Sequence, residues 1–296
     1  MIWLPATLLA GLFQAWRTAV QQRVRAELSV NAAGLVRYLY GLPVGIVLLG
    51  LYLAVSGKAL PYAGSGFLPW AAAGGFAQIV ATNFLLMAFG YRNYVVGTAY
   101  AKTEAIQGAI LSAVLLGEWL SPLSLLGIGF GVAGVVLLST GGERLKLADL
   151  GQPAALCGLA AGFGFTLTSI FVKKATLTLA TPDKVFAALV TLVVVQACQT
   201  LMQGGYVLLR ERDQLRPVLR TWRTSGQVGL LAALGSACWF TGFATANVAL
   251  VRTVGQVEVI FVLLFGHYYL NERFSRTEAL SLLLVGLGVL TAIAGA

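Results

Sequence analysis

Charged residues are too scarce in this sequence for a folded chain surrounded by water. Only 10% of the 296 residues are Asp, Glu, Lys or Arg, whereas a typical soluble domain has about 25%. Hydrophobic residues make up 58% and are grouped into long runs with short polar breaks. The composition therefore excludes an ordinary soluble enzyme, a disordered chain and a disulfide scaffold, and it favours a protein embedded in lipid.

The apolar runs predict an all-α polytopic membrane protein with ten transmembrane helices. A span needs about 20 apolar residues, and a continuous helix satisfies its own backbone polar groups, as lipid requires. No basic residue precedes the first run, so we interpret it as a span rather than a cleavable signal peptide. We expect the spans near residues 2–20, 31–54, 68–89, 95–117, 121–140, 153–173, 184–208, 228–247, 250–270 and 277–295.

An internal repeat divides the chain into two halves of five spans. When the sequence is shifted by 154 residues, Glu104 meets Glu258. The ungapped alignment of Phe89–Val135 with the second half holds ten identities. The polar segment Gly141–Gly151 lies between the halves, which we place at residues 1–145 and 146–296. An odd number of spans per half reverses its orientation. The sequence therefore predicts two inverted five-helix repeats, a common plan of secondary transporters.

Basic residues are distributed unevenly among the predicted loops. The loops after odd-numbered spans carry 12 Lys and Arg, against about five on the other side, and Arg210–Arg223 supplies five of the 12. Cytoplasmic loops carry the excess of Lys and Arg in membrane proteins. This bias predicts that both termini lie outside. It also explains the net charge of +9 without a nucleic-acid partner.

Two glutamates inside predicted spans, Glu104 and Glu258, are the leading functional candidates. Burying a charge in hydrocarbon costs several kcal/mol unless the charge is paired or solvated. Such carboxylates could line a polar cavity and hold a cationic group or a proton. Alternatively, each one pairs with a buried arginine or caps a broken helix as a structural brace. Arg37 and Arg17 are the candidate partners, although both could also extend to the membrane interface.

Other polar and aromatic residues inside the spans extend the candidate substrate site. Tyr100 lies one turn before Glu104, and its ring could hold an ammonium group by cation–π attraction. Gln256 occupies the repeat position of Lys102, so the two halves differ in charge around a shared glutamate. The remaining candidates, which interhelical hydrogen bonding or ordinary packing would also explain, are Gln14, Trp16, Gln78, Asn83 and Trp239.

The sequence offers no convincing metal, cofactor or enzyme site. The G-x-G-x-x-G pattern at Gly129–Gly134 lies inside an apolar run rather than a strand-to-helix turn, so we interpret it as close helix packing through small residues. His267 is the single histidine, and the three cysteines lie in apolar runs. Neither G-x-S-x-G, H-E-x-x-H nor C-x-x-C is present. We therefore expect no metal, no cofactor and no enzyme activity.

Two matching motifs carry a family resemblance. Thr103-Glu104-Ala105-Ile106 is followed by Leu116–Pro122, and Val257-Glu258-Val259-Ile260 is followed by Leu270–Ser275. They resemble the drug/metabolite transporter superfamily, in particular its ten-span members with two EamA-type halves. The resemblance extends over essentially the whole chain.

Three departures accompany this resemblance. The family usually has proline after the membrane glutamate, where this chain has Ala105 and Val259, and the second hinge has Asn271 in place of glycine. Ten-span relatives are usually drawn with both termini inside, which is opposite to the orientation that the loop charges favour.

The resemblance implies a transporter. Members of the superfamily export amino acids, other metabolites or cationic drugs, some import nutrients such as choline, and several use a proton gradient. We therefore expect a monomeric or homodimeric secondary active exporter of amino acids or related amines in a bacterial-type inner membrane, working by alternating access and driven by protons. The alternatives are an uncoupled uniporter or exchanger, an importer of a quaternary amine, and a multidrug or lipid flippase. A membrane-embedded enzyme would need clustered acidic ligands or a nucleophile with a base.

Overall fold

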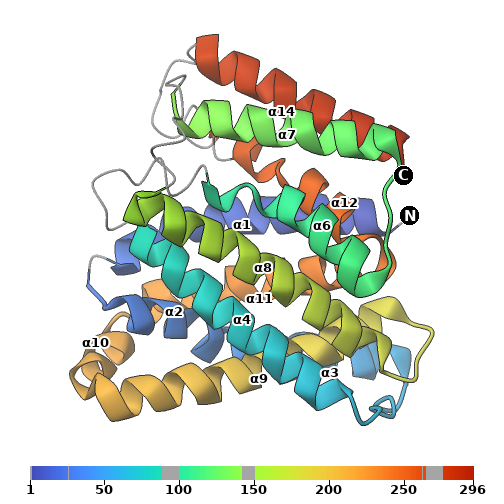
Figure 1. The fold of residues 1–296 in the computed structure, drawn as a ribbon. Helices are drawn as coiled ribbons and strands as arrows, with labels where there is room; N and C mark the ends of the chain where they lie inside the picture. Colours follow the sequence, from blue (N-terminus) through green and yellow to red (C-terminus); the bar gives the residue numbers. More distant parts are fainter. Residues whose placement is uncertain (1, 26, 89–99, 142–150, 262, 265–275) are drawn as a thin grey trace. The chain divides into compact units, whose positions relative to one another are not determined.

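The computed structural model of the protein describes residues 2–25, 27–88, 100–141, 151–261, 263–264 and 276–296 (Figure 1). Throughout these residues the named elements are helices, and the only β pairing is an isolated bridge between Ala63 and Leu179. His267, the second hinge at Asn271 and most of the segment Gly141–Gly151 lie outside the described residues. The prediction of an all-helical chain is confirmed for the part that is described.

The helices follow one another with short connections. Their bounds are α1 Trp3–Arg25, α2 Val30–Leu39, α3 Gly41–Ser56, α4 Phe67–Ala88, α6 Glu104–Leu116, α7 Pro122–Ser139, α8 Pro153–Leu177, α9 Lys184–Arg210, η2 Arg212–Gln214 (a 3₁₀ turn), α10 Leu215–Arg220, α11 Trp222–Thr245, α12 Val248–Gly255 and α14 Arg276–Ala294.

Seven helical segments of the described chain are long and apolar enough to cross a membrane: Val30–Ser56, which joins α2 and α3, and α4, α7, α8, α9, α11 and α14. Ten were predicted. Helix α1 has the length but carries several Gln and Arg residues. Helices α6 and α12 are only 13 and 8 residues long, because the predicted fourth and ninth spans are interrupted or extend outside the described residues.

The chain forms two compact units, and each draws on both halves of the sequence. Unit 1 comprises Met1–Ile79 and Thr168–Thr245, and unit 2 comprises Val80–Leu167 and Ala246–Ala296. In unit 1, α1 and α9 pack against α11, and α2 and α3 pack against α9. In unit 2, α14 packs along α7, and α12 packs against α6.

The helix bounds follow the 154-residue offset of the sequence repeat. The segment Val30–Ser56 is offset by this distance from α9, Lys184–Arg210. In the same way, Pro122 and Arg276 begin α7 and α14. The ten-span plan with inverted repeats remains a proposal, considered below.

Helices α7 and α14 lie antiparallel, in contact through glycines (Figure 1). At one end Ser124 Oγ donates to the carbonyl of Ala292 at 3.1 Å. A Cβ added at Gly127 would lie 2.5 Å from the Ala292 nitrogen, and one added at Gly134 would lie 2.8 Å from the Ser281 oxygen. Within the G-x-G-x-x-G pattern, Gly131 and Gly134 face neighbouring atoms closely, whereas Gly129 has none within 4 Å. The packing interpretation therefore holds for two of the three glycines.

Alanine substitution should distinguish the glycines in close helix contact from Gly129, which faces open space. Gly127→Ala should lower the thermal unfolding midpoint of the detergent-purified protein, because overpacking costs about 1–3 kcal/mol and exceeds the gain in helix propensity, about 1 kcal/mol. Gly129→Ala places the same methyl group in open space and should leave the midpoint unchanged or raise it. Equal effects of the two substitutions would contradict the close contact.

Asp183 joins two loops at one end of unit 1. Its carboxylate accepts hydrogen bonds from Lys58 Nζ and Tyr52 OH, and it caps α9 by accepting from the Phe186 nitrogen at 3.1 Å. The hydrogen bonds from Lys58 and then Tyr52 lower the pKa of Asp183 to about 2. This cluster fastens residues 57–66 to the start of α9.

The carboxyl ¹³C resonance of Asp183, assigned with Asp183→Asn, should titrate near pH 2. An unfolded aspartate titrates near 3.9. A lowered pKa means that the stabilisation is present above about pH 4 and is lost as the pH falls through about 2. Lys58→Met should move the midpoint upward, and an unmoved midpoint would show that the cluster does not hold in solution.

Candidate functional site

Glu104 and Glu258 each stand directly after a break in a helix. Residues 102–103 form a turn before α6 begins at Glu104, and residues 256–257 form a turn before the chain becomes helical again at Glu258. In both turns a backbone hydrogen bond joins residues three apart. It runs from Thr103 N to Tyr100 O at 3.2 Å and from Val257 N to Val254 O at 3.1 Å. The breaks are 154 residues apart. Interrupted helices at corresponding positions of two repeats are a good indicator of a transporter binding site.

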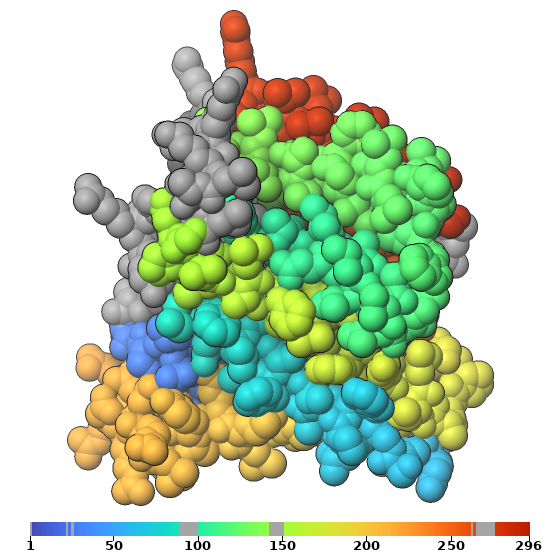
Figure 2. All heavy atoms as spheres, in the orientation of Figure 1, coloured from blue at the N-terminus to red at the C-terminus, as the bar shows by residue number. Residues whose placement is uncertain are grey.

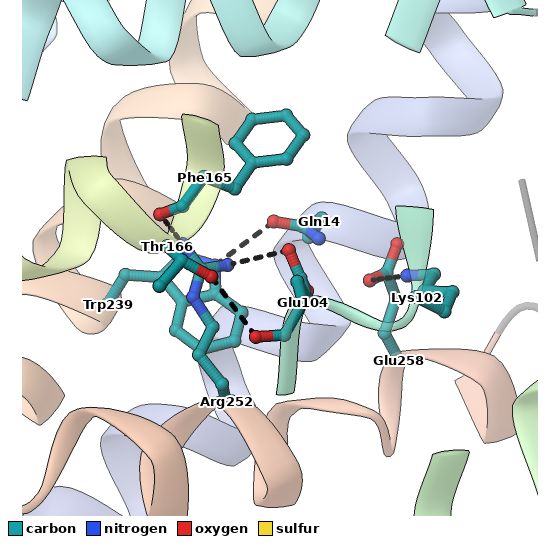
Figure 3. Close-up of polar contacts among 8 residues, drawn as sticks. All are labelled: Gln14, Lys102, Glu104, Phe165, Thr166, Trp239, Arg252 and Glu258. Atoms are coloured by element: carbon teal, nitrogen blue, oxygen red, sulfur yellow. Dashed lines mark hydrogen bonds and ion pairs between the residues drawn. The ribbon is translucent and has the colours of Figure 1, made fainter. Parts of the chain in front are cut away.

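Both glutamates form ion pairs within unit 2 (Figure 3). Lys102 Nζ lies 3.1 Å from Glu258 Oε2, and Arg252 lies 3.5 Å from Glu104 Oε2. The exposed fractions of these four side chains are between 8% and 20%. Because each pair joins a residue of the first half to one of the second, the two pairs connect the halves and balance their charges.

The backbone around Glu104 is also satisfied by side chains of unit 2. Arg252 donates to the carbonyl oxygen of Phe165 at 2.9 Å, and Thr166 donates to the carbonyl oxygen of Glu104 at 3.1 Å. Figure 3 shows both bonds together with the Arg252–Glu104 pair. Arg252 thus binds the carboxylate of Glu104 and a backbone carbonyl in the middle of α8 at once, which fixes the position of both.

The structure adds partners that the sequence did not identify. Lys102 stands two residues before Glu104, yet its hydrogen bond goes to Glu258. Arg252 was not among the candidate partners of the glutamates. The sequence does place a basic residue shortly before each glutamate. It could not show that each cation pairs with the glutamate of the other half. A role of Arg37 as an anion partner stays a prediction.

Gln256 is the most deeply buried candidate of unit 2, with 3% of its surface exposed. Its amide oxygen contacts the position where Gly131 of α7 would carry a Cβ. Among the described residues, neither its amide oxygen nor its amide nitrogen has a hydrogen-bond partner. Tyr100 and Asn83 are partly exposed. Gln256 therefore places an unused amide beside the break that precedes Glu258.

The candidates in unit 1 form separate pairs. Trp239 donates to Gln14 Oε1 at 3.1 Å, and Gln78 accepts from Gln199 Nε2 at 2.6 Å. The guanidinium carbon of the buried Arg37 lies 5.5 Å from the centre of the Tyr38 ring. Trp16 is the exception among these side chains, because 53% of its surface is exposed. Trp16 is thus placed like a residue that faces lipid rather than an interior site.

Comparison with known proteins identifies the family. A family model described as the EamA-like transporter family matches residues 1–140 and 152–294. The chain belongs to the EamA-like transporter family. Together with the seven apolar helices, this membership makes it a multi-pass membrane protein.

Individual relatives of this EamA-like chain are distant. It is 29% identical over 144 residues to the pseudopaline exporter CntI of Pseudomonas aeruginosa strain UCBPP-PA14, and the protein of that name from strain PAO1 matches equally. The match covers 48% of this chain and 46% of each relative, so the chain spans less than half the length of these curated relatives. A solved crystal structure with 18% identity and a TM-score of 0.73 covers 98% of this chain, and 97% of that chain is matched. That likeness shows the fold alone.

Removing one member of the Lys102–Glu258 pair should destabilise the EamA-like protein. A buried charge that loses its partner costs up to about 3–5 kcal/mol. We expect Lys102→Met and Glu258→Gln each to lower the free energy of unfolding in mixed micelles, and the double variant to lose less than the sum of the two. Lys58→Met serves as the comparison and should cost less, because Lys58 is 46% exposed in its own ion pair. Additive losses in the double variant would contradict the pairing.

Proposed function

We propose that the protein is a secondary active transporter that exports a small polar metabolite, an amino acid or related amine, across a bacterial-type inner membrane. Membership of a transporter family and the similarity to a pseudopaline exporter support export. Arg37, Gln78 and Asn83 are polar residues inside helices long enough to cross a membrane, where such groups mark transport pathways.

The single observation that carries this proposal is the set of two ion pairs at two helix breaks. An amino acid carries an ammonium group and a carboxylate. Its ammonium group can replace Lys102 or Arg252 at a glutamate, and its carboxylate can bind the cation that is released. A charged pair in a poorly solvated site is costly to break without such a replacement. The pairs therefore favour a substrate that carries both charges.

Alternating access would follow from ten spans in two inverted repeats, with halves at residues 1–145 and 146–296. The equal offsets of the helix bounds support a repeat. The antiparallel contact of α7 with α14 supports inversion, because these helices occupy equivalent positions in the two halves. The loop charges support an orientation with both termini outside.

The driving force that we propose is a proton gradient acting on Glu104 or Glu258. A proton can neutralise a carboxylate while its usual cation moves away, which couples proton binding to a change of pairing. Uncoupled exchange and uptake of a quaternary amine are the alternative outcomes of the transport test, and lipid flipping is the further alternative function. Either a monomer or a homodimer would contain the complete pair of breaks.

Substitution of either glutamate should strongly reduce transport while the protein remains folded. We expect Glu104→Gln and Glu258→Gln each to reduce transport in proteoliposomes at least about tenfold, because one good ionic contact contributes more than 1.4 kcal/mol. The measurement is counterflow of labelled proteinogenic amino acids and of choline, with and without an imposed pH gradient.

The control is Glu278→Gln in the first turn of α14, which changes the same charge and should transport normally. Normal transport by both site variants would overturn the proposed site. Accumulation that does not respond to the pH gradient would overturn proton coupling alone.

A further inference from the structure

The segment between α9 and α11 is the most basic part of the chain. Residues 210–223, which we call the arginine segment, hold two acidic residues and five exposed arginines, namely Arg210, Arg212, Arg216, Arg220 and Arg223. Both flanking helices are long and apolar enough to cross a membrane. The segment that joins two such helices therefore lies at a membrane surface.

The arginine segment is fastened to unit 1 by its other residues. Glu211 accepts hydrogen bonds from Ser29 Oγ at 2.5 Å and from Asn31 Nδ2 at 2.6 Å. Tyr40 OH donates to the carbonyl of Val218 at 3.0 Å, and Val218 is 1% exposed. In Figure 1, α10 accordingly lies beside α2. The arginines are thus presented on a fixed surface rather than on a free loop.

The positive charge of this surface is only partly balanced, because five arginines outnumber the two carboxylates of the segment. Glu211 is occupied by Ser29 and Asn31, and Asp213 accepts from Gln214 Nε2 at 2.9 Å. Among the described residues, none of the five arginines forms an ion pair. In Figure 2, the orange atoms of this region form an outward-facing surface. Its charge is available to an anion from outside the chain.

A hollow of about 380 Å³ lies at the end of the arginine segment. Its lining residues are Glu27, Arg220, Thr221, Trp222, Arg223 and Thr224. A guanidinium group can donate two parallel hydrogen bonds to the oxygens of one phosphate. Leu219 and Trp222 beside them are 66% and 59% exposed, and tryptophan is enriched at the membrane interface. Cationic and apolar side chains therefore meet at one place, which is the pattern of a lipid-contacting segment.

We propose that the arginine segment binds the headgroups of anionic phospholipids, with a headgroup phosphate seated between Arg220 and Arg223. The exposed Leu219 and Trp222 favour a lipid over a soluble anion, because only a lipid brings acyl chains to cover them. The site is distinct from the ion pairs of Glu104 and Glu258, and it does not depend on the transported substrate.

Binding of dihexanoyl phosphatidylglycerol to the purified full chain in neutral detergent tests this proposal. The variant carries Arg216→Gln, Arg220→Gln and Arg223→Gln. At about fivefold for each charge near a membrane surface, we expect its affinity to fall about a hundredfold. Glu27→Gln should tighten binding, because it removes a carboxylate that repels the phosphate. Unfolding midpoints without lipid show that each variant is folded.

A matched control removes three positive charges elsewhere, through Arg23→Gln, Lys184→Gln and Arg276→Gln. It should bind phosphatidylglycerol like the wild-type protein, and dihexanoyl phosphatidylcholine should bind weakly to all. Equal losses in the two triple variants would overturn the site, since binding would then follow net charge. Inorganic phosphate that competes as strongly as the lipid would overturn the choice of a lipid. Unchanged or weaker binding by Glu27→Gln would overturn the place of the phosphate.

Discussion

Hydrocarbon offers no hydrogen-bond partner, so the backbone polar groups of a membrane span must be satisfied by the chain itself. Regular helix meets this condition for the backbone along most of the chain. It fails at the two breaks before Glu104 and Glu258, where carboxylates and backbone groups need partners from elsewhere. Arg252 and Lys102 supply these partners, and Thr166 supplies a further hydrogen bond. The arrangement of unit 2 follows from this requirement.

Unit 1 uses neutral amides to satisfy backbone carbonyls and one another. Helix α9 carries three buried glutamines, of which Gln199 binds Gln78 and the carbonyl of Gly75, and Gln203 binds the carbonyl of Asn31. A hydrogen bond between neutral amides responds less strongly to an incoming ion than a pair of charges does. The two units therefore differ in the kind of molecule that could alter their internal contacts.

Much of the fold could be predicted because membrane helices obey a local rule. A run of apolar residues is sufficient to indicate helices such as α9, and the repeat was sufficient to single out Glu104 and Glu258. The breaks were harder to predict, since residues 102–103 and 256–257 contain no proline, the residue that would interrupt a helix.

The partners of the glutamates could not be predicted for a different reason. Arg252 is 148 residues from Glu104 along the chain, and sequence spacing indicates only neighbours on one helix. The same limit applies to glycine packing. Gly129 and Gly131 belong to one pattern, yet only Gly131 has the amide of Gln256 against it.

The antiparallel contact between α7 and α14 has a consequence for how the two halves can diverge. Gly127 faces Gly288, while their repeat equivalents, Ser281 and Gly134, face each other. A side chain acquired at any of the three glycines meets backbone atoms of the opposite half, so neither half can change there on its own. The charged site has no such restriction, and there the halves have come to carry different residues that complement one another. The contact between α7 and α14 thus keeps similar residues in the two halves, while the two ion pairs combine different ones.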